Sequence, residues 1–199
     1  LGTAAGLDKN GDYIDALGEL GFGFLEVGTV TPLAQSGNRK PRVFRNYKEN
    51  SIVNRLGFNN KGVDYLVNNL KNRNFKGVLG VNIGPNKDSI GDDRINDYLI
   101  CLKKVNKHAD YITINISSPN TPNLRDLHNQ EDLSVLIDAI DKCIKDLGIN
   151  KPIFTKISPD ESDNTISNII SHIENSSLSG IIATNTTIDK SMLVNEKIK

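Results

Sequence analysis

Apolar strand-like runs alternate with amphipathic helical segments along the whole chain, and this alternation constrains the fold more than any other feature. Continuously apolar, β-rich runs lie at residues 3–7, 22–27, 78–83, 111–116, 153–157 and 180–184. Apolar residues at helical spacing fill the intervals at 12–20, 61–73, 92–108, 131–147 and 163–174. Strands that are apolar on both faces are typical of a parallel sheet covered by helices. The sequence therefore predicts an α/β protein.

Polar side chains at the ends of the predicted strands discriminate between two α/β architectures. A doubly wound open sheet concentrates such groups at one switch point, whereas a barrel uses the carboxyl ends of all its strands. Here every predicted strand ends in, or is followed by, hydrogen-bonding side chains. They are Lys9, Glu26, Thr29, Asn82, Asn115, Ser118, Lys156, Asn185 and Thr186. This distribution favours a TIM-type (β/α)8 barrel.

The number of strands indicates that the barrel is incomplete in this chain. Such a barrel has eight strands and typically about 250 residues, whereas 199 residues supply about six strand and helix units. The chain also begins at Leu1 rather than at a methionine. We therefore expect residues 1–199 to form one barrel domain of a longer protein. Residues 31–60 interrupt the alternation as an excursion that contains a short hairpin, at 43–45 and 52–53. The excursion as a whole is long enough to have a functional role.

Composition and motif spacing exclude several functions. Lys plus Arg and Asp plus Glu both number 24, so no basic surface for nucleic acid is indicated. Cys101 and Cys143 lack CxxC spacing, which predicts reduced core thiols in a cytosolic protein. No apolar run reaches the length of a membrane span. Neither a P-loop nor a GxGxxG pattern occurs, so the main nucleotide-binding motifs are absent from the sequence. Tyr13 stands where a calcium loop beginning at Asp8 would need glycine, so no metal is expected.

Two lysines are candidates for the site. Lys9 follows the first predicted strand, and Lys156 ends the fifth. A buried ammonium at the end of an apolar strand is costly without an anionic partner or a lowered pKa. Lys156 could therefore pair with Glu26, hold an electron-rich cofactor or form a Schiff base.

The segment Asn115-Ile-Ser-Ser118-Pro-Asn120-Thr-Pro122 is the richest in polar groups. Strand alternation places Thr113 and Asn115 on the same side, toward a barrel axis, and Ser118 begins the following loop. A polar turn made by serine and asparagine would also explain this composition.

Seven motifs together resemble the motif series of the class 2 dihydroorotate dehydrogenases, in the same order and at similar spacing. They are Ala4-Ala-Gly-Leu-Asp-Lys9-Asn-Gly, Glu26-Val-Gly-Thr29-Val-Thr-Pro32, Asn54-Arg-Leu-Gly-Phe58-Asn-Asn60, Asn82-Ile-Gly84, Asn115-Ile-Ser-Ser-Pro-Asn-Thr-Pro122, Lys156-Ile-Ser-Pro159 and Ala183-Thr-Asn185-Thr-Thr187. Individually several are weak, but jointly they are specific.

The resemblance implies a flavin-dependent barrel enzyme of pyrimidine synthesis that oxidises dihydroorotate to orotate and passes the electrons to a quinone. Ser118 would be the general base. Class 1 relatives place Cys at that position, so the serine favours class 2. The implied substrate contacts are Lys9, Asn54, Arg55, Leu56, Gly57, Phe58, Asn115, Asn120, Asn185 and Thr186. The implied contacts to the FMN cofactor are Ala5, Gly6, Leu7, Asp8, Lys9, Thr29, Asn82, Asn115, Lys156 and Thr184.

The resemblance also implies a cellular location and parts that lie outside this chain. An N-terminal helical segment would precede it, form the quinone path and make a peripheral contact with the cytoplasmic face of the inner membrane. The last strands and the phosphate-binding loops would follow it. Three alternatives stay open from the sequence: another FMN-dependent barrel oxidoreductase, a Schiff-base aldolase that uses Lys156, and a scaffold without catalytic activity.

Overall fold

The structure, a computed structural model, describes residues 1–117 and 130–191. Its centre is a five-stranded parallel sheet in the order β1-β4-β5-β6-β7. The strands are β1 (Phe24–Val30), β4 (Val78–Ile83), β5 (Tyr111–Asn115), β6 (Ile153–Lys156) and β7 (Gly180–Ile182). Ser118 and Asn120 lie outside the described residues.

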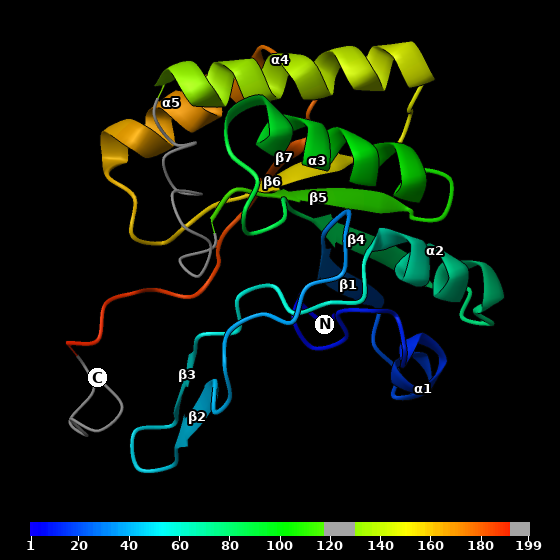
Figure 1. Ribbon diagram of the computed structural model, residues 1–199, viewed down its shortest axis with the longest axis vertical. Coiled ribbons are helices and arrows are strands. Elements are labelled where there is room, and N and C mark those ends of the chain that lie inside the picture. Colours follow the sequence, from blue (N-terminus) through cyan, green and yellow to red (C-terminus); the bar gives the residue numbers. More distant parts are fainter. Residues whose placement is uncertain (118–129, 192–199) are drawn as a thin grey trace.

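The helices that connect the strands lie on one face of this sheet (Figure 1). They are α2 (Val63–Asn72), α3 (Gly91–Val105), α4 (Gln130–Leu147) and α5 (Asp163–Glu174), and a shorter helix, α1 (Ile14–Glu19), precedes β1. In a doubly wound sheet the helices would cover both faces. Strands in sequence order with their helices on one side instead form the wall of an α/β barrel, as predicted.

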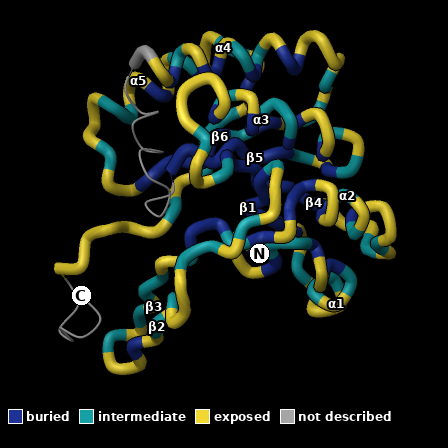
Figure 2. Tube along the Cα trace, in the orientation of Figure 1, coloured by how far each residue is buried: buried dark blue, intermediate teal, exposed yellow. Residues whose placement is uncertain are grey.

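The core lies between the sheet and these helices, and sequence patterning explains its position. Alternate β5 residues Ile112 and Ile114 are buried against the helices, whereas Thr113 and Asn115 are on the opposite, inner face. On α4, the apolar residues at helical spacing are buried from Leu133 to Ile144, whereas Leu147, which the same spacing predicts to be buried, is exposed at the end of the helix. Figure 2 shows the sheet as the most deeply buried layer.

The predicted first strand is wrong. Residues 3–7 form no strand; an isolated parallel bridge joins Gly2 to Phe24 at the start of β1. The chain then turns at Gly6, where φ is +108°, a conformation that glycine adopts without steric penalty. It still follows β1, because the Gly6 N–H donates to the Gly28 carbonyl at 2.8 Å.

Two strands of the sheet end two or more residues away from the predicted carboxyl end. β1 continues to Val30, three residues beyond the predicted end, so Glu26 lies in the middle of the strand. β7 ends at Ile182 rather than at residue 184. The polar residues that follow, Thr184 and Asn185, belong to a segment without regular structure.

The predicted hairpin is present as β2 (Val43–Asn46) and β3 (Ser51–Asn54), an antiparallel pair that projects away from the sheet (Figure 1). The base of this excursion is closed by two hydrogen bonds between the backbones of Gln35 and Asn60, each 3.0 Å long. The excursion therefore leaves the barrel wall and returns to it at a fixed point.

Cys101 and Cys143 are both buried free thiols, as the sequence predicts. Burial raises the pKa of each thiol, which keeps them protonated. Within residues 1–117 and 130–191, no helix has the length and hydrophobicity of a membrane span.

Replacing Ile112 with alanine tests the position of the core. Ile112 is fully buried, so Ile112→Ala should lower the free energy of unfolding of the full-length protein by about 2–5 kcal/mol in urea titrations. Ile52→Ala is the control, because that side chain is 62% exposed and should change stability by about 0.5 kcal/mol or less. Equal effects would contradict the assigned core.

Candidate functional site

A cavity of about 120 Å³ lies at the carboxyl ends of the strands. Six separate parts of the chain line it: the loop before α1, the end of the hairpin excursion, the ends of β1, β5 and β6, and the segment after β7. Its lining residues are Ala5, Gly6, Lys9, Thr29, Asn54, Leu56, Gly57, Phe58, Asn115, Lys156, Asn185 and Thr186. All twelve are predicted site residues, so the structure brings together groups that are remote in the sequence.

Five other predicted site residues lie off this cavity. Leu7 is 66% exposed. The Asp8 carboxylate instead accepts hydrogen bonds from the backbone N–H groups of Asp12 and Tyr13, at 3.0 and 2.8 Å, and so fixes the turn before α1. Arg55 donates to the Pro41 carbonyl and braces the hairpin.

The remaining two are Asn82 and Thr184. The Thr184 hydroxyl donates to the Asn185 carbonyl at 3.0 Å. Asn82 is fully buried beneath the cavity, where it contacts the lining residue Thr29.

The hairpin excursion supplies one wall of the cavity through Gly57 and Phe58. Both have positive φ, +69° and +50°, a strained conformation for phenylalanine that persists only where the surroundings hold it. Asn60 supplies that restraint, because its amide donates to the Phe58 carbonyl at 2.7 Å and to Thr31 Oγ1 at 2.8 Å. The Phe58 ring is thereby fixed in a buried position at the cavity.

Glu26 is the buried anion of the inner sheet face. Its carboxylate accepts hydrogen bonds from Asn82 Nδ2 at 3.0 Å, from the Tyr111 hydroxyl at 2.9 Å and from Thr113 Oγ1 at 3.1 Å. Burial and the adjacent carboxylate raise the pKa of Tyr111, so the phenol stays a donor. No ion pair joins Glu26 to Lys156, and the pairing of these two residues considered from the sequence is wrong.

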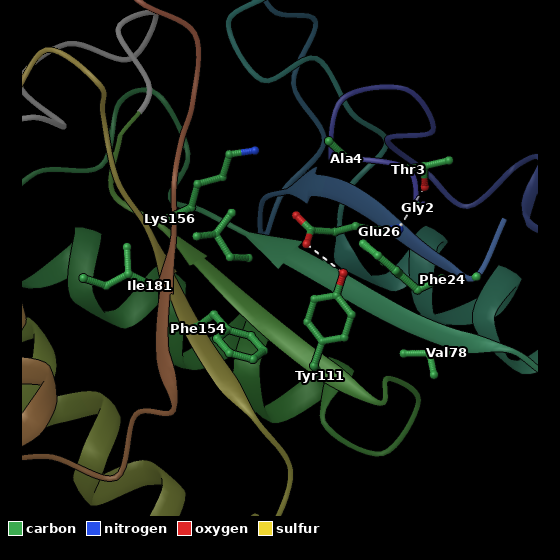
Figure 3. Close-up of a pocket in the computed structure, with 12 residues that line it drawn as sticks. Gly2, Thr3, Ala4, Phe24, Glu26, Val78, Tyr111, Phe154, Lys156 and Ile181 are labelled. Carbon is green, nitrogen blue, oxygen red and sulfur yellow. Dashed lines mark hydrogen bonds between the residues drawn. The ribbon is translucent and has the colours of Figure 1, made fainter.

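A second, larger and mostly apolar cavity of about 520 Å³ lies on the same inner face. Phe24, Tyr111 and Phe154 line it, and Tyr111 meets each of the other two rings edge to face. Figure 3 shows these rings together with the Tyr111 to Glu26 hydrogen bond. Lys156 borders both cavities and is therefore at the boundary between the apolar interior and the polar rim.

Two cations face the small cavity without a carboxylate partner among the described residues. Lys156 is 7% exposed. Burial, with a smaller effect of the nearby Arg42 guanidinium, lowers the pKa of Lys9 to about 8. Two desolvated ammonium groups favour an anionic or electron-rich ligand, which would supply the missing opposite charge.

A chain of side-chain hydrogen bonds runs from Glu26 along the floor of this cavity. Thr29 Oγ1 donates to Asn82 Oδ1 at 2.6 Å, and Asn115 Nδ2 donates to Thr29 Oγ1 at 3.1 Å. Ser117 Oγ donates to Asn115 Oδ1 at 2.8 Å and accepts from Asn185 Nδ2 at 3.0 Å. The chain thus connects β1, β4, β5 and the segment after β7.

Ser117, Tyr111 and Thr113 were not predicted as site residues. Their signal was present, since Tyr111, Thr113, Asn115 and Ser117 alternate along one strand and its extension, and this period places them on one face.

Two glycines leave room at the site, one between neighbouring strands and one beside the cavity. A Cβ on Gly28 would lie 2.3 Å from the Asn82 carbonyl oxygen, so only glycine allows β1 and β4 to come this close. A Cβ on Gly6 would meet no atom within 4 Å. Gly6 therefore faces open space at the cavity, where a flat ligand could approach the backbone.

Removing Arg42 tests the electrostatics of the cavity. A neighbouring positive charge disfavours the protonated lysine, so Arg42→Met should raise the pKa of Lys9 from about 8 toward, but not to, its ordinary value, because burial persists. The measurement is NMR titration of isotopically labelled lysine in full-length protein freed of small ligands. Arg45→Met, which removes a charge that does not affect Lys9, is the control. A wild-type pKa at the ordinary lysine value would contradict the burial of Lys9.

Comparison with known proteins agrees with this geometry. A family model described as dihydroorotate dehydrogenase matches residues 1–199. The dihydroorotate dehydrogenase (quinone) of Pseudoalteromonas atlantica is 52% identical over 194 residues, covering 96% of this chain and 58% of the relative. That of Legionella pneumophila strain Lens is 50% identical over 199 residues, covering 98% of this chain and 60% of the relative.

Solved structures show the same likeness. The crystal structure of Eimeria tenella DHODH in complex with ferulenol has a TM-score of 0.89 at 36% identity, and covers 99% of this chain and 59% of that chain. The ligand-free enzyme from the same organism has a TM-score of 0.86 at 36% identity. The chain thus spans about 60% of the length of these relatives. These matches confirm the predicted barrel class and the resemblance drawn from the seven motifs, and the chain belongs to the dihydroorotate dehydrogenase family.

Proposed function

We propose that the protein containing this chain oxidises dihydroorotate to orotate in pyrimidine synthesis and passes the electrons to a quinone. The observation that carries the proposal is the convergence of Lys9, residues 54–58, Asn115, Lys156 and residues 185–186 on one cavity. The quinone as acceptor is supported by the names of the relatives that are 50–53% identical to this chain.

The cavity suits FMN as the cofactor. Gly6 leaves open space beside the backbone, and Lys156 is a buried cation without an anionic partner among the described residues. Thr29, Asn115 and Lys156 would hold the flavin from the strands, and Ala5 and Gly6 from the loop before α1. Bound there, FMN would supply the hydride acceptor for the substrate, and Lys156 would favour the negative charge of the reduced flavin. The proposed flavin contacts also include Leu7, Asp8, Asn82 and Thr184, which lie off the small cavity.

The remaining lining residues would bind the ring substrate. Dihydroorotate presents carbonyl oxygens, ring N–H groups and a carboxylate, which match amide side chains and one ammonium. Lys9 would pair with the carboxylate, and Asn54, Asn115 and Asn185 would bind the ring edge. Leu56, Gly57 and Phe58 would exclude water from it, while Arg55 holds the hairpin and Thr186 closes the opposite side. Asn120 completes the proposed set.

Ser118 is the proposed general base. It directly follows Ser117, whose hydroxyl lies in the hydrogen-bond chain at the cavity. A serine hydroxyl is a weak base at neutral pH, so proton removal needs a dry site and a group that relays the proton onward. Thr121, which lies three residues beyond Ser118 in the sequence, is the candidate relay.

The Schiff-base aldolase has no support beyond the lysine itself, since the chain belongs to a family of redox enzymes. Another FMN-dependent oxidoreductase would use the same flavin contacts but would not need the asparagines. We further propose a peripheral contact with the cytoplasmic face of the inner membrane, made by a segment that precedes this chain in the full-length protein.

Ser118→Ala should lower the rate of flavin reduction by dihydroorotate at least about 100-fold, because it removes the proton acceptor. Rapid-mixing absorbance of the full-length enzyme measures this rate, and orotate binding should be largely kept. Ser134→Ala, on the exposed side of α4, is the control and should reduce at the wild-type rate. An unchanged rate in Ser118→Ala would remove this residue from the mechanism.

Lys156→Met should lower the midpoint potential of the bound flavin by at least about 30 mV, which corresponds to a tenfold change in a two-electron equilibrium. The reason is loss of the cation that stabilises the reduced form. Potentiometric titration of the full-length flavoprotein measures it. Lys151→Met is the matched control, because Lys151 lies just before β6 and donates to the Asn106 and Ala109 carbonyls, away from the cavity. Equal potentials in wild type and Lys156→Met would contradict the role of Lys156.

A further inference from the structure

Ser117 occupies a junction that the proposed function does not use. Its side chain is fully buried, directly after β5. The hydroxyl donates to Asn115 Oδ1 at 2.8 Å and accepts from Asn185 Nδ2 at 3.0 Å. Asn115 ends β5 and Asn185 lies in the segment after β7, and both line the small cavity. Ser117 is therefore the direct link between them.

In the series of side-chain hydrogen bonds from Asn185 to Glu26, every donor points toward Glu26. Glu26 itself explains this direction at its end of the series. An ionised carboxylate only accepts hydrogen bonds, so Asn82 must direct its Nδ2 toward Glu26 and its Oδ1 toward Thr29. The Thr29 hydroxyl then donates to Asn82, and its lone pair faces Asn115 Nδ2. Each donor thus points along the chain toward Glu26.

Backbone N–H groups impose the same direction at the other end. The Ser117 N–H donates to Asn115 Oδ1 at 3.1 Å, and the Thr186 N–H donates to Asn185 Oδ1 at 2.8 Å. A backbone N–H cannot accept a hydrogen bond, so both amides must present oxygen there. Rotating either side-chain amide by half a turn would point its NH2 group at a backbone N–H group, where two donors would face each other. Both asparagine amides are therefore fixed in one orientation.

This fixed orientation determines what the cavity offers a ligand. Asn115 Oδ1 already accepts two hydrogen bonds from Ser117, and Asn185 Oδ1 accepts one from Thr186. Each Nδ2 group carries two hydrogens. Asn115 donates one of them to Thr29 and Asn185 donates one to Ser117, and each retains a second hydrogen. Lys9 and Lys156 add ammonium groups to the same cavity. All four residues, the two asparagines and the two lysines, therefore present hydrogen-bond donors to a ligand.

We propose that Ser117 is a positioning residue: it holds Asn115 and Asn185 with their amide N–H groups available to the ligand, so that this part of the site selects molecules by carbonyl or carboxylate oxygens. The inference rests on the proposed function, because the ligand concerned is the ring substrate or its product. Ser117 itself contacts neither; it acts through the two amides.

Ser117→Ala in the full-length flavoprotein tests this role. The variant removes the acceptor of Asn185 and one donor to Asn115, so orotate should bind about 5- to 10-fold more weakly, the range expected for one lost hydrogen bond. Isothermal titration calorimetry measures the dissociation constant without turnover. Flavin content and melting temperature report whether the variant is folded.

Ser158→Ala is the matched control. Ser158 is also a fully buried serine that follows a strand end, after β6, but its hydroxyl bonds to Asp160 and lies off the cavity. Its orotate dissociation constant should stay within about twofold of wild type, the change expected where no ligand contact is altered. Ser117→Cys, which keeps the volume but weakens the hydrogen bonds, serves if the alanine variant does not fold.

A double-mutant cycle with Asn185→Ala separates positioning from a general structural effect. If Ser117 acts through Asn185, Ser117→Ala should weaken orotate binding much less in the Asn185→Ala background than in wild type. Full additivity, or an unchanged dissociation constant in Ser117→Ala and Ser117→Cys, would overturn the proposal. Failure of the wild-type flavoprotein to bind orotate at all would instead overturn the proposed function.

Discussion

The buried carboxylate of Glu26 is the interaction on which the polar half of the sheet depends. A charge in this interior is tolerated because three donors from two neighbouring strands, Asn82, Tyr111 and Thr113, converge on it. Those hydrogen bonds hold the inner faces of β1, β4 and β5 in one register. The amide that serves Glu26 also starts the chain that orders the cavity floor.

The site is built on this frame by segments of different rigidity. Strand ends provide Thr29, Asn115 and Lys156, whose positions follow from the sheet. The hairpin excursion contributes Phe58 from outside the barrel wall, and Asn60 fixes it there. The strands thus present the polar groups, and the loop held by Asn60 covers them with an apolar surface. Barrel enzymes commonly combine strand ends and loops in this way.

Sequence reasoning identified all twelve lining residues, some because strand ends converge in a barrel and the others through the motifs that resemble the family. It placed Lys9, Thr29, Asn115, Lys156 and Asn185 at such ends, and all five line the cavity. It could not tell that Asp8 turns away to hold the backbone before α1, since an aspartate near a site and an aspartate in a turn look alike in sequence. It also missed Ser117: alternation along the strand places this serine on the inner face, but only its two partners in space show what it connects.

The sequence by itself determined the alternation of strands and helices, the parallel sheet, the hairpin and the family, because these follow from local periodicity and from motif order. Only the tertiary structure decided that Lys156 has no bond to Glu26, that the first predicted strand is a single bridge, and that the asparagine amides share one orientation. The physical reason is that a hydrogen-bond partner is chosen by distance and direction in space. Glu26 and Thr113, 87 residues apart, meet only once the sheet has formed.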